Sequence, residues 1–256
     1  MTFKDWIFSN RPSDNQTIAG QWGWLHITTL LVCIATIITL ALVFRKRSEK
    51  ARKIVIWILV GIIFVFEMSR RSINLIKTTD YSAHNLLHTL LPRPWCAIAC
   101  WSLIASVLVN KKFFYNFASI TALLCAIIYF AYPGTGFNDK YIVFENVYSI
   151  TTHGMLLITS ITLITLKFTK FEYKNIWKEL ICLGFVFLYA ILEIFVLKIE
   201  ADPLYFMPGG DIQDIFGVQW GVYLTIYIIF VVIYLNMFYL IDDRKNVFVK
   251  RKKTAK

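Results

Sequence analysis

Apolar residues recur along this chain in seven long runs, and a short polar or charged segment separates each run from the next. Each run is close to the roughly 20 residues that an α-helix needs to cross the hydrocarbon core of a bilayer. The pattern therefore predicts an all-α, polytopic membrane protein: a seven-transmembrane-helix bundle that forms a single domain over residues 1–256. We expect the spans at about 21–44, 54–76, 89–110, 113–132, 143–166, 179–197 and 219–241.

The composition agrees with a protein whose solvent is a bilayer. Hydrophobic residues make up 57% of the chain and the mean hydropathy is +0.59, whereas soluble domains are about 45–50% apolar. The first 20 residues include Lys4, Asp5, Arg11 and Asp14, so they lack the apolar core of a cleavable signal peptide. We therefore expect the first apolar run to remain in the protein as a membrane span.

The positive charges predict the orientation of the bundle. The formal net charge is +11, and most of the 27 lysines and arginines fall in the segments after the first, third, fifth and seventh runs. Residues 45–53 are the densest such segment, and the tail 242–256 is also strongly basic. Because Lys and Arg accumulate on the cytoplasmic side, the N-terminus is predicted outside and the basic tail inside. No nucleic-acid-binding motif accompanies the charge.

The five cysteines lie in or beside apolar runs, without the spacing of a disulfide framework or a zinc site. His84 and His88 share an i,i+4 spacing, but no further ligand stands near them in the sequence. We therefore predict no metal site and no cofactor. Cys33, Cys125 and Cys182 are expected to be inert packing residues, because free cysteine behaves mainly as a small hydrophobe.

Five of the predicted spans carry a polar or reactive side chain toward their outer ends. These residues are His26, Glu67, Cys96, His153 and Glu193. Ionisable residues within a span are costly, and they usually face the bundle interior or a water-filled cavity. Their shared depth, counted at about 1.5 Å per helical residue, predicts one polar cavity that opens outward.

Each of these residues also has a purely structural interpretation. Glu67 has i,i+3 and i,i+4 spacing to Arg70 and Arg71, which fits an ion pair at the membrane interface. His26 is a candidate interfacial residue, and Glu193 is near enough to its helix end to reach water. A buried His153 is also consistent with a hydrogen-bonded core residue.

Several short segments resemble one family of membrane proteins, the YwaF family of seven-helix bacterial proteins. That family is grouped with the eukaryotic transmembrane protein 164 acyltransferases. Leu91–Cys96 is similar to the family's Leu-Pro-x-His-x-Cys, and Thr152–Gly154 is similar to its Ser-His-Gly. Where the family commonly has a histidine two residues before the cysteine, this chain has Pro94. The other matching segments are Trp24–His26, Glu67 and Tyr205–Pro208.

The resemblance implies an acyl-transfer site in a bacterial plasma membrane, with Cys96 as nucleophile and His153 as its base. Thr151 or Thr152 is a candidate donor to the oxyanion. The implied substrate is a membrane glycerophospholipid, so membrane lipids are the expected partners. The substrate-binding residues would be Glu67, Arg70, Arg71, His26, Glu193 and Thr152, with the arginines on the headgroup phosphate.

Two non-enzymatic alternatives remain open. The same outward cavity would suit a transporter or binding protein for a small solute or lipid, in which Glu67, Glu193 and the arginines are ligands and Cys96 only packs. The sequence also allows a structural subunit of a membrane complex. The separation of Cys96 from His153 discriminates, because a general base must lie within hydrogen-bond reach of the proton that it takes.

Overall fold

Every element of the described chain is a helix, and no strand occurs among the described residues. The computed structural model describes residues 2–9, 22–93, 95–131, 137, 142–199, 202, 204–209, 213 and 216–254, with side chains to Asp243. The helices are α1 (Phe3–Phe8), α2 (Trp24–Phe44), α3 (Glu49–Lys77), α4 (Ala83–Leu90), α5 (Trp95–Val109), α6 (Lys112–Ala131), α7 (Phe144–Thr165), η1 (Tyr173–Asn175), α8 (Ile176–Ile191), η2 (Leu192–Leu197, a π-helical turn) and α10 (Trp220–Thr254).

Five helical segments in the described part are long and apolar enough to cross a membrane. They are α2, α6, α7, Tyr173–Leu197 and Trp220–Asp243, and the pair α4 and α5 makes a sixth if it counts as one bent span. The chain is therefore a multi-pass integral membrane protein, as predicted. With 29 residues, α3 is also long enough to cross a membrane. It is not among these five segments, and its apolar stretch is followed by the charged residues Glu67, Arg70 and Arg71.

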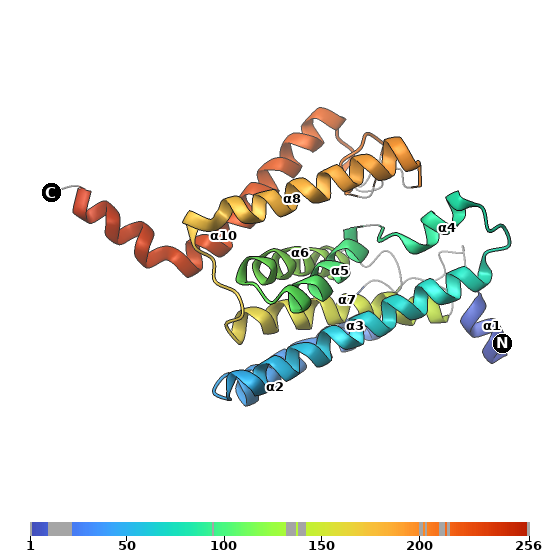
Figure 1. Cartoon of the computed structure of the whole chain (residues 1–256), viewed down its shortest axis with the longest axis horizontal. Helices are drawn as coiled ribbons and strands as arrows, with labels where there is room; N and C mark the ends of the chain where they lie inside the picture. The colour runs from blue at the N-terminus through green and yellow to red at the C-terminus, as the bar shows by residue number, and fades with distance from the viewer. Residues whose placement is uncertain are drawn as a thin grey trace.

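Helices α6 and α7 pack against each other at the centre of the bundle; α5 packs against α6, α2 packs against α7, and α3 packs against both α5 and α7 (Figure 1). Their position follows from small residues that allow close helix packing. Ala118, Ala122 and Ala126 repeat every fourth residue of α6 and are fully buried. On α7, a Cβ added to Gly154 would lie only 3.2 Å from the Cys33 Sγ of α2. Close packing therefore fixes the faces that α6 and α7 present to each neighbour.

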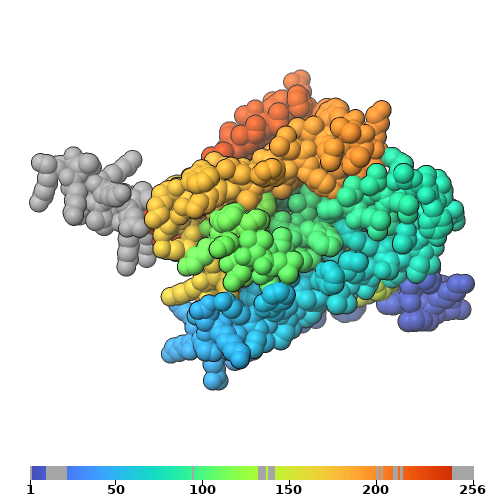
Figure 2. Space-filling view, viewed as in Figure 1, coloured from blue at the N-terminus to red at the C-terminus, as the bar shows by residue number. Residues whose placement is uncertain are grey.

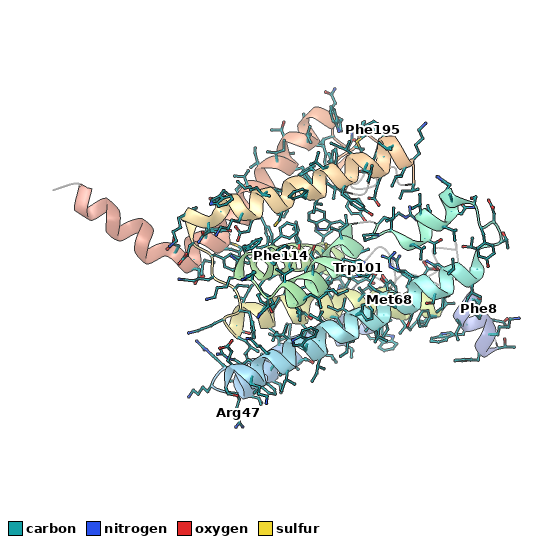
Figure 3. All side chains as sticks on the ribbon, viewed as in Figure 1. Phe8, Arg47, Met68, Trp101, Phe114 and Phe195 are labelled. Carbon is teal, nitrogen blue, oxygen red and sulfur yellow. The ribbon has the colours of Figure 1, made fainter. Side chains whose placement is uncertain are left out.

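Helices α8 and α10 both lie on the side of α5 and α6 that is opposite α2 and α3 (Figures 1 and 2). Large apolar side chains remain exposed on the outer helices, including Met68 of α3 and Phe195 of η2 (Figure 3). Such faces suit contact with lipid tails, which are as apolar as the side chains themselves. The helical backbone of α10 continues through the basic tail to Thr254, beyond the predicted end of the seventh span.

The predicted third span is not one continuous helix, which corrects the expectation for residues 89–110. α4 ends at Leu90 and α5 begins at Trp95, with 65° between the two helices. Pro92 explains the break, because proline disfavours helical geometry in the residue before it. Leu91 accordingly has an extended backbone, with φ −74° and ψ 146°. Cys96 is therefore the second residue of a helix rather than a residue two turns inside one.

Candidate functional site

The structure brings Cys96 of α5 and His153 of α7 into direct contact. The Cys96 Sγ lies 3.1 Å from the His153 Nε2. The other ring nitrogen, Nδ1, lies 2.7 Å from the backbone oxygen of Ser149. A carbonyl can only accept, so Nδ1 carries the proton and donates it to Ser149. In the neutral imidazole, the lone pair of Nε2 then faces the thiol and accepts from it.

Tyr129 of α6 fixes the plane of the His153 ring. The two rings stack with their centroids 3.7 Å apart and their planes 6° from parallel. The Ser149 hydroxyl also donates to the Tyr129 hydroxyl at 3.4 Å. Sequence analysis missed both residues. Ser149 was detectable, since it precedes His153 by four residues on the same helical face, but nothing distinguishes Tyr129 from the other aromatic residues of its span.

The Cys96 thiol also neighbours a second thiol, that of Cys125 on α6. Cys100 lies one turn after Cys96 and is fully buried. All five cysteines are free thiols. The prediction that Cys125 is only a packing residue stays a prediction, but this residue borders the site, whereas Cys182 lies on α8.

The start of α5 gives Cys96 a favourable electrostatic environment. Backbone N–H groups in the first turn of a helix have no partner within the helix, and the helix dipole is positive at that end. Cys96 occupies this first turn. A negative charge on its sulfur, or on an oxygen bonded to the atom that it attacks, is stabilised there. Pro94, the departure from the family motif, lies outside the described residues.

Glu67 of α3 is fully buried and has three partners. The Tyr148 hydroxyl of α7 donates to its Oε1. Its Oε2 lies 3.1 Å from Arg71 Nη2 and 3.9 Å from Arg70 Nη2. A buried carboxylate requires such partners, because an uncompensated charge away from water is strongly destabilising. The i,i+3 and i,i+4 spacing thus produces an ion pair inside the protein, rather than at its surface.

Arg71 forms hydrogen bonds with the backbone where α4 ends, just before the connection to α5. Its Nη1 donates to the backbone oxygens of Thr89, Leu90 and Leu91, at 3.2 Å for Thr89 and 3.0 Å for Leu91. These carbonyls belong to the end of α4, where a helix leaves its last acceptors unpaired. Because Glu67 and these carbonyls engage both terminal nitrogens of Arg71, this side chain positions the segment that precedes Cys96.

His26 and Glu193 are both fully buried, so neither is a surface residue at the membrane interface. The His26 ring lies 4.6 Å from the Trp22 ring and 4.7 Å from the Phe137 ring. Phe137 in turn lies 5.8 Å from Tyr129, the residue stacked on the catalytic candidate His153. Glu193 belongs to η2 and lies beside Tyr189, on the α8 side of the bundle.

Thr152 is buried, and its hydroxyl has no hydrogen-bond partner among the described residues. It adjoins His153 in α7 and follows Tyr148 by one turn, whereas Thr151 is only half-buried. A buried hydroxyl without a partner is unusual, because its desolvation is not compensated. Of the two threonines, Thr152 is therefore the better candidate to donate to a ligand.

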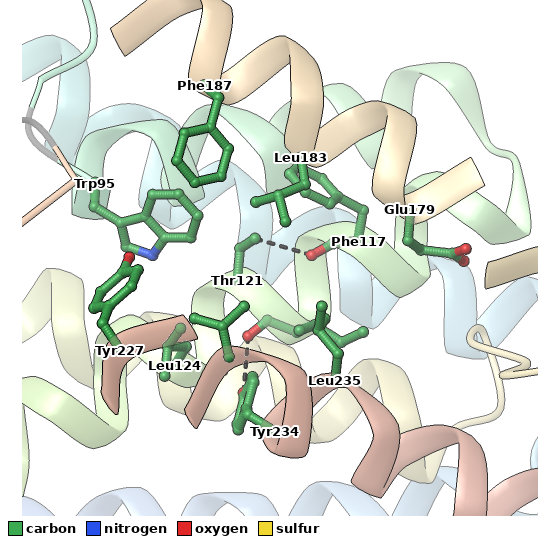
Figure 4. A pocket seen from close by; sticks show the side chains of 12 residues that line it. Trp95, Phe117, Thr121, Leu124, Glu179, Leu183, Phe187, Tyr227, Tyr234 and Leu235 are labelled. Carbon is green, nitrogen blue, oxygen red and sulfur yellow. Dashed lines mark hydrogen bonds between the residues drawn. The ribbon is translucent and has the colours of Figure 1, made fainter. Parts of the chain in front are cut away.

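An apolar pocket of about 40 Å³ adjoins this site on the side of α8 and α10. Trp95, the neighbour of Cys96, lines it together with Leu124, the neighbour of Cys125. In Figure 4, Trp95 and Tyr227 lie at one end of the pocket, and the Glu179 carboxylate points away from its centre. The walls come from α5, α6, α8 and α10.

Within the described part of the chain, no three His, Cys, Asp or Glu side chains group together as metal ligands would. The predicted absence of a metal stays a prediction. The chemistry-bearing atoms that the structure assembles are a thiol, an imidazole, a buried carboxylate with two guanidinium groups, and hydroxyl groups.

The sequence matches the profile of the TMEM164 family over residues 21–242. This region contains all the candidate site residues described above. No curated protein and no solved structure gives a match. The chain belongs to the TMEM164 family.

Proposed function

From this family membership and the geometry at Cys96, we propose that the protein is a cysteine-dependent acyltransferase that acts on membrane glycerophospholipids. The observation that carries the proposal is the 3.1 Å contact between Cys96 Sγ and His153 Nε2. A nucleophile and base at this separation, with the base oriented by a third group, make up the arrangement that nucleophilic catalysis needs. The resemblance of Leu91–Cys96 and Thr152–Gly154 to the bacterial YwaF branch supports the same assignment.

The first half of the reaction forms an acyl-enzyme. His153 Nε2 takes the thiol proton, and the Cys96 sulfur attacks the ester carbonyl carbon of a phospholipid. The carbonyl oxygen becomes an oxyanion, which the Thr152 hydroxyl and the first-turn N–H groups of α5 stabilise. The bond between this carbon and the glycerol oxygen then breaks. The glycerol oxygen takes the proton from His153, a lysophospholipid leaves, and the acyl group remains on Cys96 as a thioester.

The second half transfers the acyl group to an acceptor. The hydroxyl of a different lysophospholipid gives its proton to His153 and attacks the thioester carbonyl. The carbon–sulfur bond breaks, and the Cys96 sulfur recovers the proton from His153. The sum of the two halves moves one acyl group between two glycerol hydroxyls and needs no oxidant, metal or nucleotide.

The groups around Cys96 and His153 support this pair both as neutral thiol and imidazole and as thiolate and imidazolium. Nδ1 keeps its proton throughout and donates a hydrogen bond to the Ser149 carbonyl, so the ring keeps its orientation while Nε2 gains and loses a proton. Tyr129 stacks on the ring and favours the transient imidazolium through its electron-rich face. The apolar surroundings strengthen the attraction between thiolate and imidazolium, because the local dielectric constant is low.

The proposal includes the full topology. The five long apolar segments, the bent pair α4 and α5, and the charged helix α3 together make seven spans. The connections dense in Lys and Arg, with the basic tail, would then lie in the cytoplasm, and the N-terminus outside. Cys96 and His153 would face the outer leaflet of a plasma membrane, from which the lipid substrate enters.

An acyl-exchange assay tests the proposal. Membranes that contain the purified protein, a diacyl phospholipid with a labelled acyl chain and an unlabelled lysophospholipid should form labelled product. Cys96→Ala should reduce the rate to background, because it removes the thiol that lies within hydrogen-bond reach of His153 Nε2. Cys182→Ala is the matched control, since that thiol is also partly exposed but lies on α8. Equal rates for wild type and Cys96→Ala would overturn the proposal and favour a binding or transport protein.

A further inference from the structure

A polar cavity of about 260 Å³ lies at the C-terminal end of α3, separate from the apolar pocket beside Trp95. Its volume falls just below the range of about 300–1,000 Å³ that is usual for small-molecule sites. The lining comes from α3, α4 and the connection to α5. Its charged or polar side chains include Arg70, Asn74, Lys77, Thr78, His88 and Arg93.

Three of these side chains, Arg70, Lys77 and Arg93, are cations that line the same cavity, and each also has a neighbour that holds it. Arg93 donates through Nε to the backbone oxygen of His88 at 2.9 Å and through Nη1 to that of Ile199, and its Nη2 lies 2.8 Å from His88 Nδ1. The Lys77 ammonium lies 3.4 Å from the backbone oxygen of Ser9. The Arg70 side chain is 24% exposed, and its guanidinium lies over the Tyr148 ring. Among the described residues that line this cavity none is acidic, and the nearest carboxylate to Arg70 is that of Glu67, 3.9 Å from Nη2.

The cavity lies a short distance from Cys96 and His153. Arg70 sits 5.2 Å from the centre of the Tyr148 ring. Tyr148 precedes His153 by five residues of α7, which is about 7.5 Å along the helix axis. On the other wall, Leu91 and Arg93 come immediately before the start of α5. In a glycerophospholipid, only the glycerol carbons and ester oxygens separate the phosphate from an acyl carbonyl.

We propose that this cavity binds the phosphodiester of a glycerophospholipid and so places an acyl ester beside Cys96. This inference rests on the proposed acyl-transfer function. Guanidinium groups recognise phosphate oxygens with paired, charge-assisted hydrogen bonds, and an ammonium adds a point charge. Arg70 and Arg93 supply guanidinium groups from two walls of the cavity, and Lys77 supplies an ammonium group. Arg71 is not part of this phosphate site, because its terminal nitrogens bind Glu67 and the backbone oxygens at the end of α4.

Binding can be measured without turnover in the Cys96→Ala protein. The probe is dihexanoyl phosphatidylcholine, which is short enough to dissolve, and dihexanoyl glycerol is the matched ligand without phosphate. The double substitution Arg70→Gln and Lys77→Gln should weaken binding of the phospholipid about ten-fold to a hundred-fold, given the usual strength of hydrogen bonds to charged groups. It should leave binding of the diglyceride unchanged. Arg47→Gln is the control, because that exposed arginine lies at the opposite end of α3 (Figure 3).

The outcomes separate this inference from the proposed function. Equal weakening for both ligands, or none for either, overturns the phosphate site. Binding of inorganic phosphate with no binding of the phospholipid overturns the lipid assignment in favour of a free anion. If the acyl-exchange assay fails while the phosphate-dependent binding persists, the catalytic proposal alone is wrong. If exchange proceeds normally in the double variant, the phosphate site alone is wrong.

Discussion

Replacing Arg71 with methionine tests how the start of α5 is held next to His153. Methionine keeps an unbranched stem but has neither charge nor donor. The change leaves the buried Glu67 carboxylate with the Tyr148 hydroxyl and with Arg70, whose nearest nitrogen is 3.9 Å away. It also removes the donor that three backbone oxygens at the end of α4 share. The segment before Cys96 should therefore loosen.

The expected loss of stability is large. Removal of one partner from a buried ion pair costs about 3–5 kcal/mol, and Glu67 here loses its nearer cation and keeps only the more distant Arg70. At about 2–4 °C per kcal/mol for proteins of this size, the melting temperature should fall by roughly 6–20 °C. Glu67→Gln should cost less, because Arg71 keeps its carbonyl acceptors and glutamine still accepts from Tyr148. Combining the two substitutions should recover part of the loss caused by Arg71→Met alone.

Thermal unfolding in detergent micelles, followed by tryptophan fluorescence, measures all four proteins. The acyl-exchange rate of each at a temperature where it is folded shows whether the break also positions Cys96. A melting temperature for Arg71→Met equal to that of wild type would refute this reasoning. So would a double variant that loses as much stability as the two single substitutions added together, since no coupling would then join the two side chains.

Three further predictions concern the surroundings of the dyad. His153→Gln should abolish acyl exchange and slow alkylation of Cys96 by a maleimide, because no base then accepts the thiol proton; wild-type alkylation would contradict this. Tyr129→Phe should keep most activity, since the stacked ring remains, whereas Tyr129→Leu should lose about ten-fold or more; equal rates for both would exclude a role for stacking. Gly154→Ala should destabilise by about 1–3 kcal/mol through its tight contact with Cys33, and Cys33→Ala should relieve this in the same melting assay.

Counting positions along the predicted helices anticipated some of the contacts that the structure shows. The pairing of Glu67 with Arg71 follows from i,i+4 spacing, which places both on one helical face. The family resemblance indicated Cys96 and His153, which the structure finds 3.1 Å apart. The depth counted for Cys96, two turns inside a span, was wrong, because α5 begins only at Trp95. Helix rise is a fixed quantity, so depth along a span is readable from sequence only where the start of the helix is placed correctly.

The rotation of each helix about its axis was not predictable in the same way. Tyr129 and Cys125 border the dyad because buried alanines set the face that α6 turns toward α5 and α7. No single-sequence pattern distinguishes these neighbours from other residues of the same apolar run. The role of Arg71 was hidden for a related reason. The hydrogen bonds of Arg71 depend on where α4 ends. The apolar run from 89 to 110 reads as one continuous helix, whereas the structure has a break at Pro92.

The most direct test of the central claim is the mass of the protein after exposure to its proposed substrate. Purified protein incubated with a diacyl phosphatidylcholine, in the absence of an acceptor, should gain the mass of one acyl group. Peptide mapping should place it on Cys96, and neutral hydroxylamine should remove it, as it does thioesters. Cys96→Ala and His153→Gln should gain nothing. An acyl adduct of equal yield in Cys96→Ala, or acyl exchange by the wild type with no adduct at Cys96, would contradict the account.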